Sequence, residues 1–229
     1  GDPLPPRSED GMAIYARWQR DLLLADFAGL CRYAAANRTL SPATSGRIVF
    51  IGDSITEAWL AGQPDFFTGD RIDRGISGQT TTQMLARFRA DVVELQPRVV
   101  HIMAGTNDIA GNIGATSLDR IEANIRTMVD LAEAHGIAVV IGSVLPARQF
   151  NWRPEIASVA PIAALNVRLR ALAAERNLVF ADYYAALDDG EQGLAKVHAE
   201  DGVHPTEAGY AVMRPITERA LASAAGKVS

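Results

Sequence analysis

From residue 46 onward, short apolar runs rich in β-branched residues alternate with longer amphipathic segments, and this alternation most constrains the fold. The runs are bounded by Gly or Pro and cover 47–51, 99–103, 137–141 and 178–181, with a weaker one at 71–73. Segments with helical periodicity lie between them at 80–94, 117–134, 162–176 and 206–225. Strands that alternate with helices require right-handed crossovers, which give a parallel sheet covered on both faces. The sequence therefore predicts a three-layer α/β fold.

The composition fits one domain with an N-terminal extension. The chain has 229 residues, of which 48% are hydrophobic and 21% charged, enough apolar mass for one sizeable core. No linker rich in Pro, Gly or Ser divides the middle. Residues 11–37 instead carry apolar positions with helical periodicity, namely Ile14, Trp18, Leu22, Phe27, Leu30 and Tyr33. We expect residues 1–45 to form an extension with a helix packed on the domain, and residues 46–229 to form the domain itself.

Charge and cysteine content exclude several functional classes. The chain has 22 basic and 27 acidic residues, which give a net charge of −5, and it contains no block of Lys or Arg. We therefore expect no nucleic-acid partner. The most apolar stretch, 136–145, is far shorter than the roughly 20 residues that span a bilayer, so we expect no integral membrane association. Cys31 is the single cysteine, which excludes a disulfide within the chain and a zinc site built from several cysteines. We expect Cys31 to be a small buried apolar residue.

Polar residues follow three of the predicted strands, where the binding crevice of such a sheet lies. Ser54 comes at a strand-to-helix turn, a position that suits a nucleophile, although Gly-Asp-Ser could also be only a turn and a helix cap. Gly78 lies in a glycine-containing turn, where a backbone N–H can approach a ligand closely. Asn107 offers a side-chain amide after the third strand, or caps a helix. Each segment alone is a weak signal.

A fourth segment, just before the last predicted helix, contains an acid and a histidine. Asp201 precedes His204 by three residues, so its carboxylate can reach one imidazole nitrogen while the other faces the crevice. This pair can act as a general base. The other histidines are interpreted as packing or surface residues: His101 within a strand, His135 at a helix end and His198 in a loop. The chain contains no metalloprotease helix motif, no phosphate-binding loop and no Gly-x-Ser-x-Gly elbow.

Taken together, the segments resemble the SGNH, or GDSL-type, hydrolase family. The corresponding blocks are Gly52-Asp53-Ser54, Ile76-Ser77-Gly78, Gly105-Thr106-Asn107-Asp108 and Asp201-Gly202-Val203-His204-Pro205. The resemblance spans roughly 47–213, and Ile55 stands where the family usually has leucine. It implies a flavodoxin-like parallel sheet, serine-dependent hydrolysis of acyl esters, and no metal or organic cofactor. Segments 74–81 and 143–147 are similar to a bacterial branch of acylhydrolases and acetylesterases that is often exported.

The expected roles follow from these blocks. Ser54 would attack the ester carbonyl, His204 would take its proton, and Asp201 would hold the imidazole. The oxyanion hole would consist of the backbone N–H groups of Ser54 and Gly78 and the side-chain amide of Asn107. Two further acids, Asp53 and Asp108, are interpreted as supporting or capping residues, with direct substrate contact as the alternative.

The loop at 146–155 bears on the substrate, which we expect to be a small-molecule or carbohydrate ester. Trp152 could stack on a sugar ring and Arg153 could pair with an anionic group, or Trp152 could simply pack the loop onto the domain. The polar mouth, with Thr56, Thr80 and Thr81 expected near the serine turn or the Gly78 turn, favours short acyl groups, with a lysophospholipase or thioesterase and a non-catalytic binding module as alternatives. By resemblance the chain would be periplasmic or secreted, its signal peptide already removed; a cytoplasmic location is the alternative.

Overall fold

A five-stranded parallel sheet forms the centre of the computed structural model, which describes residues 14, 17, 20–21, 23–43 and 46–227. Its strands are β1 (Ile48–Gly52), β2 (Arg71–Gly75), β3 (Val99–Met103), β4 (Ala138–Gly142) and β5 (Val179–Ala181). They lie in the order β2-β1-β3-β4-β5. The chain therefore builds outward on opposite sides of β1, and the strand order reverses between β1 and β3. In such sheets ligands bind beyond the carboxyl ends of the strands at this point. The expected parallel sheet and three-layer α/β fold are confirmed.

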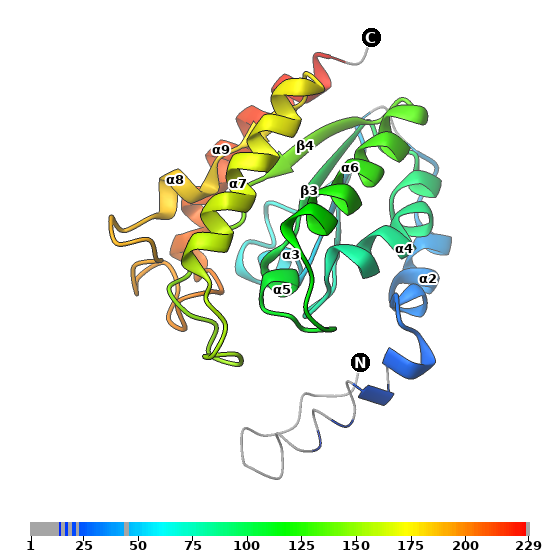
Figure 1. Ribbon diagram of the computed structural model, residues 1–229. Coiled ribbons are helices and arrows are strands. Elements are labelled where there is room, and N and C mark those ends of the chain that lie inside the picture. The colour runs from blue at the N-terminus through cyan, green and yellow to red at the C-terminus, as the bar shows by residue number, and fades with distance from the viewer. Residues whose placement is uncertain (1–13, 15–16, 18–19, 22, 44–45, 228–229) are drawn as a thin grey trace.

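Helices cover both faces of this sheet (Figure 1). Helices α4, α6 and α7 pack on one face, and α3, α8 and α9 pack on the other. The bounds are α2 (Leu30–Thr39), α3 (Ser54–Gly62), α4 (Thr81–Asp91), the 3₁₀ helix η1 (Val93–Leu95), α5 (Thr106–Ile109), α6 (Leu118–Ala134), α7 (Val159–Glu175), α8 (Tyr183–Leu187) and α9 (Glu207–Ala225). Because both faces are covered, every residue of β3 is buried, which explains why this strand is almost entirely apolar.

The face under α3, α8 and α9 holds an aromatic cluster. Phe50, Trp59 and Tyr183 belong to it and are fully buried. His101 of β3 lies among them, with its ring centroid 5.1 Å from that of Phe50 and its Nε2 2.9 Å from the hydroxyl of Tyr183. His101 is therefore a core residue, as its position within a strand indicated.

The N-terminal segment contacts the domain through α2, whose Asn37 Nδ2 donates to Asp91 Oδ1 of α4 at 2.7 Å. Gly29, with φ 69°, separates α2 from the helical residues before it. Ile14, Phe27 and Leu30 are exposed, whereas Trp18 and Leu22 lie outside the described residues. The expectation that Cys31 is buried is wrong. The reason is that α2 contacts the domain through the polar groups of Arg32, Tyr33 and Asn37 and contains no buried residue.

No helix in the described ranges is both long enough and apolar enough to cross a membrane.

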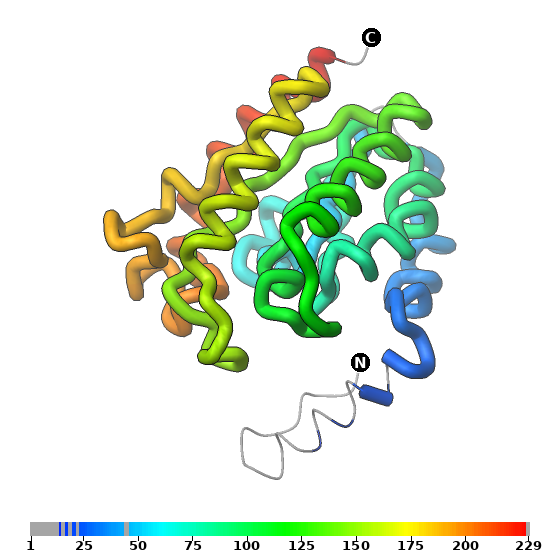
Figure 2. Tube along the Cα trace, viewed as in Figure 1, coloured from blue at the N-terminus to red at the C-terminus, as the bar shows by residue number. Residues whose placement is uncertain are grey.

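The loops that follow the strands gather at one edge of the sheet. Figure 2 shows the 143–158 segment running toward the segment before α9. The two segments are joined by a hydrogen bond from Asn151 Nδ2 to the carbonyl of Asp201 at 2.7 Å. Segments about 50 residues apart in sequence therefore meet at the carboxyl edge of the sheet.

Candidate active site

Ser54 is the first residue of α3, directly after β1. Asp53 caps this helix, because its Oδ1 accepts a hydrogen bond from the N–H of Ile55 at 2.9 Å. A Cβ at Gly52 would lie 2.0 Å from Thr56 Oγ1, so a glycine is needed where the strand turns tightly into the helix. The turn leaves Ser54 partly exposed at the carboxyl edge of the sheet.

The acid and histidine before α9 complete a hydrogen-bonded chain with this serine. Ser54 Oγ lies 2.9 Å from His204 Nε2, and His204 Nδ1 lies 2.7 Å from Asp201 Oδ2. The other carboxylate oxygen, Asp201 Oδ1, accepts from the N–H groups of Val203 at 2.9 Å and His204 at 2.8 Å. An ionised carboxylate at Nδ1 favours the tautomer in which Nδ1 carries the proton and Nε2 accepts from the serine hydroxyl.

The environment of Asp201 supports that ionised form. Partial burial raises the pKa of Asp201, but the N–H groups and the imidazole that hydrogen-bond to its carboxylate lower it further, and the net pKa is below its usual value.

Asn107 joins the loop that carries Ser54 to the loop that carries Gly78. Gly78 has φ 79°, a left-handed conformation that glycine adopts without strain. Asn107 is buried, and its Nδ2 lies 3.2 Å from Asp53 Oδ2 and 3.1 Å from the carbonyl oxygen of Gln79. Its amide is thus directed between the loop that carries Ser54 and the loop that carries Gly78. An oxyanion bound by Asn107 would share or replace one of these two long hydrogen bonds.

The two other aspartates stabilise loops of the site. Burial raises the pKa of Asp53 to about 6, although the N–H of Ile55 opposes that change. Asp108 accepts from the N–H of Thr81 at 2.9 Å and from its hydroxyl at 2.6 Å, which joins α5 to the start of α4. Both acids therefore have the supporting positions that the sequence suggested.

The three threonines lie in the interior. Thr56, Thr80 and Thr81 are all buried. Thr80 forms a capping box with Gln83 at the start of α4. Thr80 and Thr81 therefore stabilise the start of α4, and none of the three forms the polar mouth surface that the sequence predicted.

The loop at 146–155, called the mouth loop from here on, contains the two residues predicted to bind substrate. It places one of them next to His204. Trp152 is 39% exposed, and its ring centroid lies 6.1 Å from that of His204. It also packs on Phe150, with ring centroids 5.3 Å apart. Arg153 instead pairs with Glu155, with Nε 3.1 Å from Oε1, so its charge already has a counterion.

Sequence reasoning missed two residues that hold the site loops together. Asn112 lies between Asn107, Gly78 and Trp152, and hydrogen-bonds to all three. Arg87 is a buried residue of α4, and its guanidinium donates to the carbonyl of Gly52 at 3.1 Å and to Gln79 Oε1 at 2.6 Å. An arginine among the apolar positions of the predicted 80–94 helix was a usable signal for Arg87. For Asn112, the signal was another asparagine five residues after Asn107.

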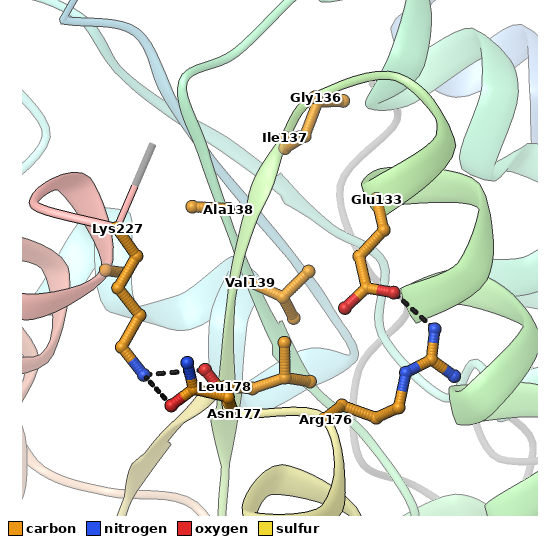
Figure 3. A pocket seen from close by; sticks show the side chains of 10 residues that line it. Glu133, Gly136, Ile137, Ala138, Val139, Arg176, Asn177, Leu178 and Lys227 are labelled. Atoms are coloured by element: carbon orange, nitrogen blue, oxygen red, sulfur yellow. Dashed lines mark hydrogen bonds and ion pairs between the residues drawn. The ribbon is translucent and has the colours of Figure 1, made fainter. Parts of the chain in front are cut away.

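A hollow of about 400 Å³ lies at the opposite edge of the sheet, where β4 and β5 begin (Figure 3). Its cations already have partners: Arg176 pairs with Asp130 at 2.8 Å and with Glu133, and Lys227 Nζ donates to the carbonyl of Asn177 at 2.6 Å. This hollow therefore lies at the amino ends of β4 and β5, and neither Ser54 nor His204 lines it. Across the described residues, no group of three or more His, Cys, Asp or Glu side chains could hold a metal ion.

Comparison with known proteins identifies the family and the fold of this chain. The GDSL-like lipase/acylhydrolase family profile matches residues 50–212. A crystal structure of a Bacteroides fragilis protein described as an acylhydrolase is 44% identical, with a TM-score of 0.85, over 87% of this chain and 99% of that one. A GDSL-like lipase from Bacteroides thetaiotaomicron is also 44% identical, with a TM-score of 0.84, over 87% of this chain and 100% of that one.

Two curated proteins are more distant. The acetylxylan esterase of Geobacillus stearothermophilus is 25% identical over 199 residues, which cover 73% of this chain and 90% of that enzyme. The Bacillus subtilis lipoprotein YqeF is 32% identical over 87 residues, only 37% of this chain and 36% of that protein. The family match and the structural relatives confirm the resemblance in the sequence blocks. The chain belongs to the GDSL-like lipase/acylhydrolase family and is a hydrolase that acts on ester bonds.

Proposed function

We propose that this protein is a serine esterase that removes short acyl groups, above all acetyl, from polar alcohols such as carbohydrates. The catalytic part of the proposal rests on two contacts. Ser54 Oγ lies 2.9 Å from His204 Nε2, and His204 Nδ1 lies 2.7 Å from Asp201 Oδ2. A nucleophile, a base and an orienting carboxylate within hydrogen-bond distance of one another are the arrangement that acyl transfer requires.

In the first half of the reaction, Ser54 Oγ attacks the ester carbonyl as its proton passes to His204 Nε2. Asp201 stabilises the imidazolium that forms. The negative charge on the former carbonyl oxygen is bound by the N–H groups of Ser54 and Gly78 and by the Asn107 amide; each such donor contributes about 2.7–4 kcal/mol in comparable sites. His204 then returns the proton to the leaving alcohol, and the acyl group remains on Ser54.

In the second half, water attacks the acyl-enzyme. His204 takes a proton from this water, the serine ester bond breaks, and Ser54 regains its proton as the carboxylic acid leaves. The chain's own residues suffice for both halves, so the proposal requires no metal or organic cofactor.

The mouth supports a polar alcohol as the leaving group. Trp152 is partly exposed next to His204, and sugars stack on aromatic rings in such positions. Asn151 is also exposed on the same loop. The similarity to an acetylxylan esterase, distant as it is, points to the same substrate class. We also propose an envelope or extracellular location for this protein, because part of its chain is similar to a lipoprotein.

The catalytic assignment is tested with Ser54→Ala and His204→Ala, assayed on p-nitrophenyl acetate. Each should abolish most turnover, and the double variant should be little worse than either single one because the residues act as a unit. Ser223→Ala, which removes an exposed hydroxyl from α9, is the matched control and should keep full activity. A fluorophosphonate should label the native protein but not Ser54→Ala. Turnover by Ser54→Ala at the native rate would refute the mechanism, and a native protein without turnover or labelling would support a binding module.

The substrate assignment is tested with p-nitrophenyl esters of increasing acyl length and with acetylated sugars. A longer acyl chain gains about 0.8 kcal/mol per CH₂ only where an apolar slot buries it. We expect kcat/KM to be highest for acetyl or butyryl esters, and Trp152→Ala to impair acetylated sugars more than small aryl acetates. A preference that rises to octanoyl or decanoyl esters would replace this assignment with a lysophospholipase or thioesterase.

A further inference from the structure

Asn112 forms a hydrogen-bonded bridge between three parts of the site. Its Nδ2 donates to Asn107 Oδ1 at 2.8 Å and to the carbonyl of Gly78 at 3.1 Å. Its Oδ1 accepts from the indole N–H of Trp152 at 3.0 Å. The backbone N–H of Asn112 also donates to the carbonyl of Asn107 at 3.0 Å. Both ends of the Asn112 amide are therefore engaged, and its backbone is tied to the residue that its side chain contacts.

These bonds act on the two groups that the reaction needs in fixed positions. An asparagine amide can bind in two orientations that exchange its oxygen and nitrogen. Nδ2 of Asn112 can only donate hydrogen bonds. The amide of Asn107 must therefore turn its oxygen, Oδ1, toward Asn112. Nδ2 of Asn107 is then directed to the opposite side, toward Asp53 and the carbonyl of Gln79.

The bond to Gly78 restrains a residue that has no side chain to hold it. Glycine at φ 79° has more conformational freedom than any other residue, so its N–H direction needs support from neighbours. Anchoring the Gly78 carbonyl limits that freedom. Asn112 thus contacts two of the three proposed oxyanion donors from outside the oxyanion hole.

We propose that Asn112 is a positioning residue that holds Asn107 and Gly78 in the geometry required for oxyanion binding and joins them to Trp152 of the mouth loop. This inference rests on the proposed function, because it concerns the same oxyanion hole. Asn112 itself need not touch the substrate. Misplacement of a donor by about 1 Å can cost about a hundredfold in rate, so a positioning residue of this kind has a measurable effect.

The first experiment is a double-mutant cycle on p-nitrophenyl acetate with Asn107→Ala, Asn112→Ala and the double variant. Asn107→Ala should lower kcat by about 10²–10³. Asn112→Ala should lower kcat by about 10–100-fold with KM within a few-fold. The double variant should be less impaired than the product of the single effects, because the part of the Asn112 effect that passes through Asn107 is already lost in Asn107→Ala. Independent, multiplicative effects would overturn the proposal.

The second experiment separates positioning from packing. Asn112→Asp nearly preserves shape and can still accept from Trp152, but its ionised carboxylate would oppose Asn107 Oδ1 and the Gly78 carbonyl. We expect Asn112→Asp to lower kcat at least as much as Asn112→Ala. A near-native kcat for Asn112→Asp would mean that Asn112 only fills space, which would overturn the proposal.

The link to the mouth loop is tested with Trp152→Phe, which keeps a ring but removes the indole N–H. It should lower kcat by a few-fold in the native background and have no further effect with Asn112→Ala. An equal effect in both backgrounds would show that Trp152 acts independently of Asn112.

Asn166→Ala is the matched control, since Asn166 is also a buried asparagine with two hydrogen bonds, both to the backbone of Val144. It should lower Tm but leave kcat per active site unchanged, where active sites are counted by fluorophosphonate labelling. A native protein that neither labels nor turns over would refute the proposed function. Failure of the cycle in an active enzyme would refute only the role of Asn112.

Discussion

Asp201 performs two tasks with its two carboxylate oxygens. Oδ1 accepts two backbone N–H groups and shapes the turn before α9, while Oδ2 faces His204 Nδ1. Asp201→Asn would keep the size of the side chain, and its Oδ1 could still accept the backbone hydrogen bonds. Its NH₂ group, however, would face His204 Nδ1 and favour the tautomer that places the proton toward Ser54. We expect kcat to fall by up to about 10⁴ with little change in Tm.

The control for this prediction is Glu200→Gln, which removes the charge of an exposed neighbour. It should keep kcat within a few-fold of the native value. A loss of less than tenfold in Asp201→Asn would mean that the carboxylate matters for the turn and not for the imidazole.

At the scale of elements, the ends of β1 and β2 are packed against the start of α3. A Cβ at Gly75 would lie 2.2 Å from the backbone nitrogen of Glu57 and 2.8 Å from the backbone carbon of Thr56. Because the obstacle is backbone, it cannot rotate away as a side chain would. Gly75→Ala should therefore displace α3 and Ser54 relative to the Gly78 loop. We expect a stability loss of more than about 3 kcal/mol, measured by urea unfolding, and a large fall in kcat.

Gly226→Ala is the corresponding control at the C-cap of α9, where a Cβ would meet only carbonyl oxygens at 3.6 Å and 3.7 Å. It should change the free energy of unfolding by less than about 0.5 kcal/mol. A Gly75→Ala protein with native stability and kcat would show that the contact between β2 and α3 is not tight.

The elements that the sequence predicted correctly are those with long periodic patterns. The four long helices and the strands of the sheet lie within a few residues of the expected ranges, because burial on one or both faces enforces the pattern. The short helices α5 and α8 were not predicted, since one turn has no periodicity. The exposure of Cys31 was not predictable either, because it depends on which side of α2 meets α4.

The candidate site also contains residues that the sequence could predict and residues that it could not. Ser54, Gly78 and Asn107 follow strands, and parallel strands bring their carboxyl ends to one edge, so their proximity could be expected from the sequence. The bridge formed by Asn112 could not, because it depends on where the loop with Trp152 lies relative to α5. Hydrogen bonds between irregular segments leave no periodic pattern in a sequence.

For the whole molecule, the buried His101 couples stability to pH. Burial lowers the pKa of His101 to about 3, from 6.5 for an exposed histidine. The folded protein therefore keeps His101 neutral while the unfolded chain takes up a proton below pH 6.5. The stabilisation is fully present above pH 6.5 and is lost as the pH falls toward 3. Asp53 and Asp73 act in the opposite direction, because burial raises their pKa values to about 6 and about 7.

A comparison of the native protein with His101→Leu isolates the contribution of the histidine from those opposing terms. Leucine removes the titrating group, while Tyr183 keeps its hydrogen bond to Thr217 Oγ1 at 2.7 Å. The free energy of unfolding of the native protein relative to that of His101→Leu, measured with urea, should fall by about 1.6 kcal/mol between pH 6.5 and pH 5, because the slope approaches about 1.4 kcal/mol per pH unit only below pH 6.5. Val140 lies in the same core cluster and has no titratable group. The loss of unfolding free energy in Val140→Ala should therefore not vary with pH. An equally constant difference for His101→Leu would contradict the lowered pKa, because it would mean that His101 takes up a proton in the folded core as readily as in the unfolded chain.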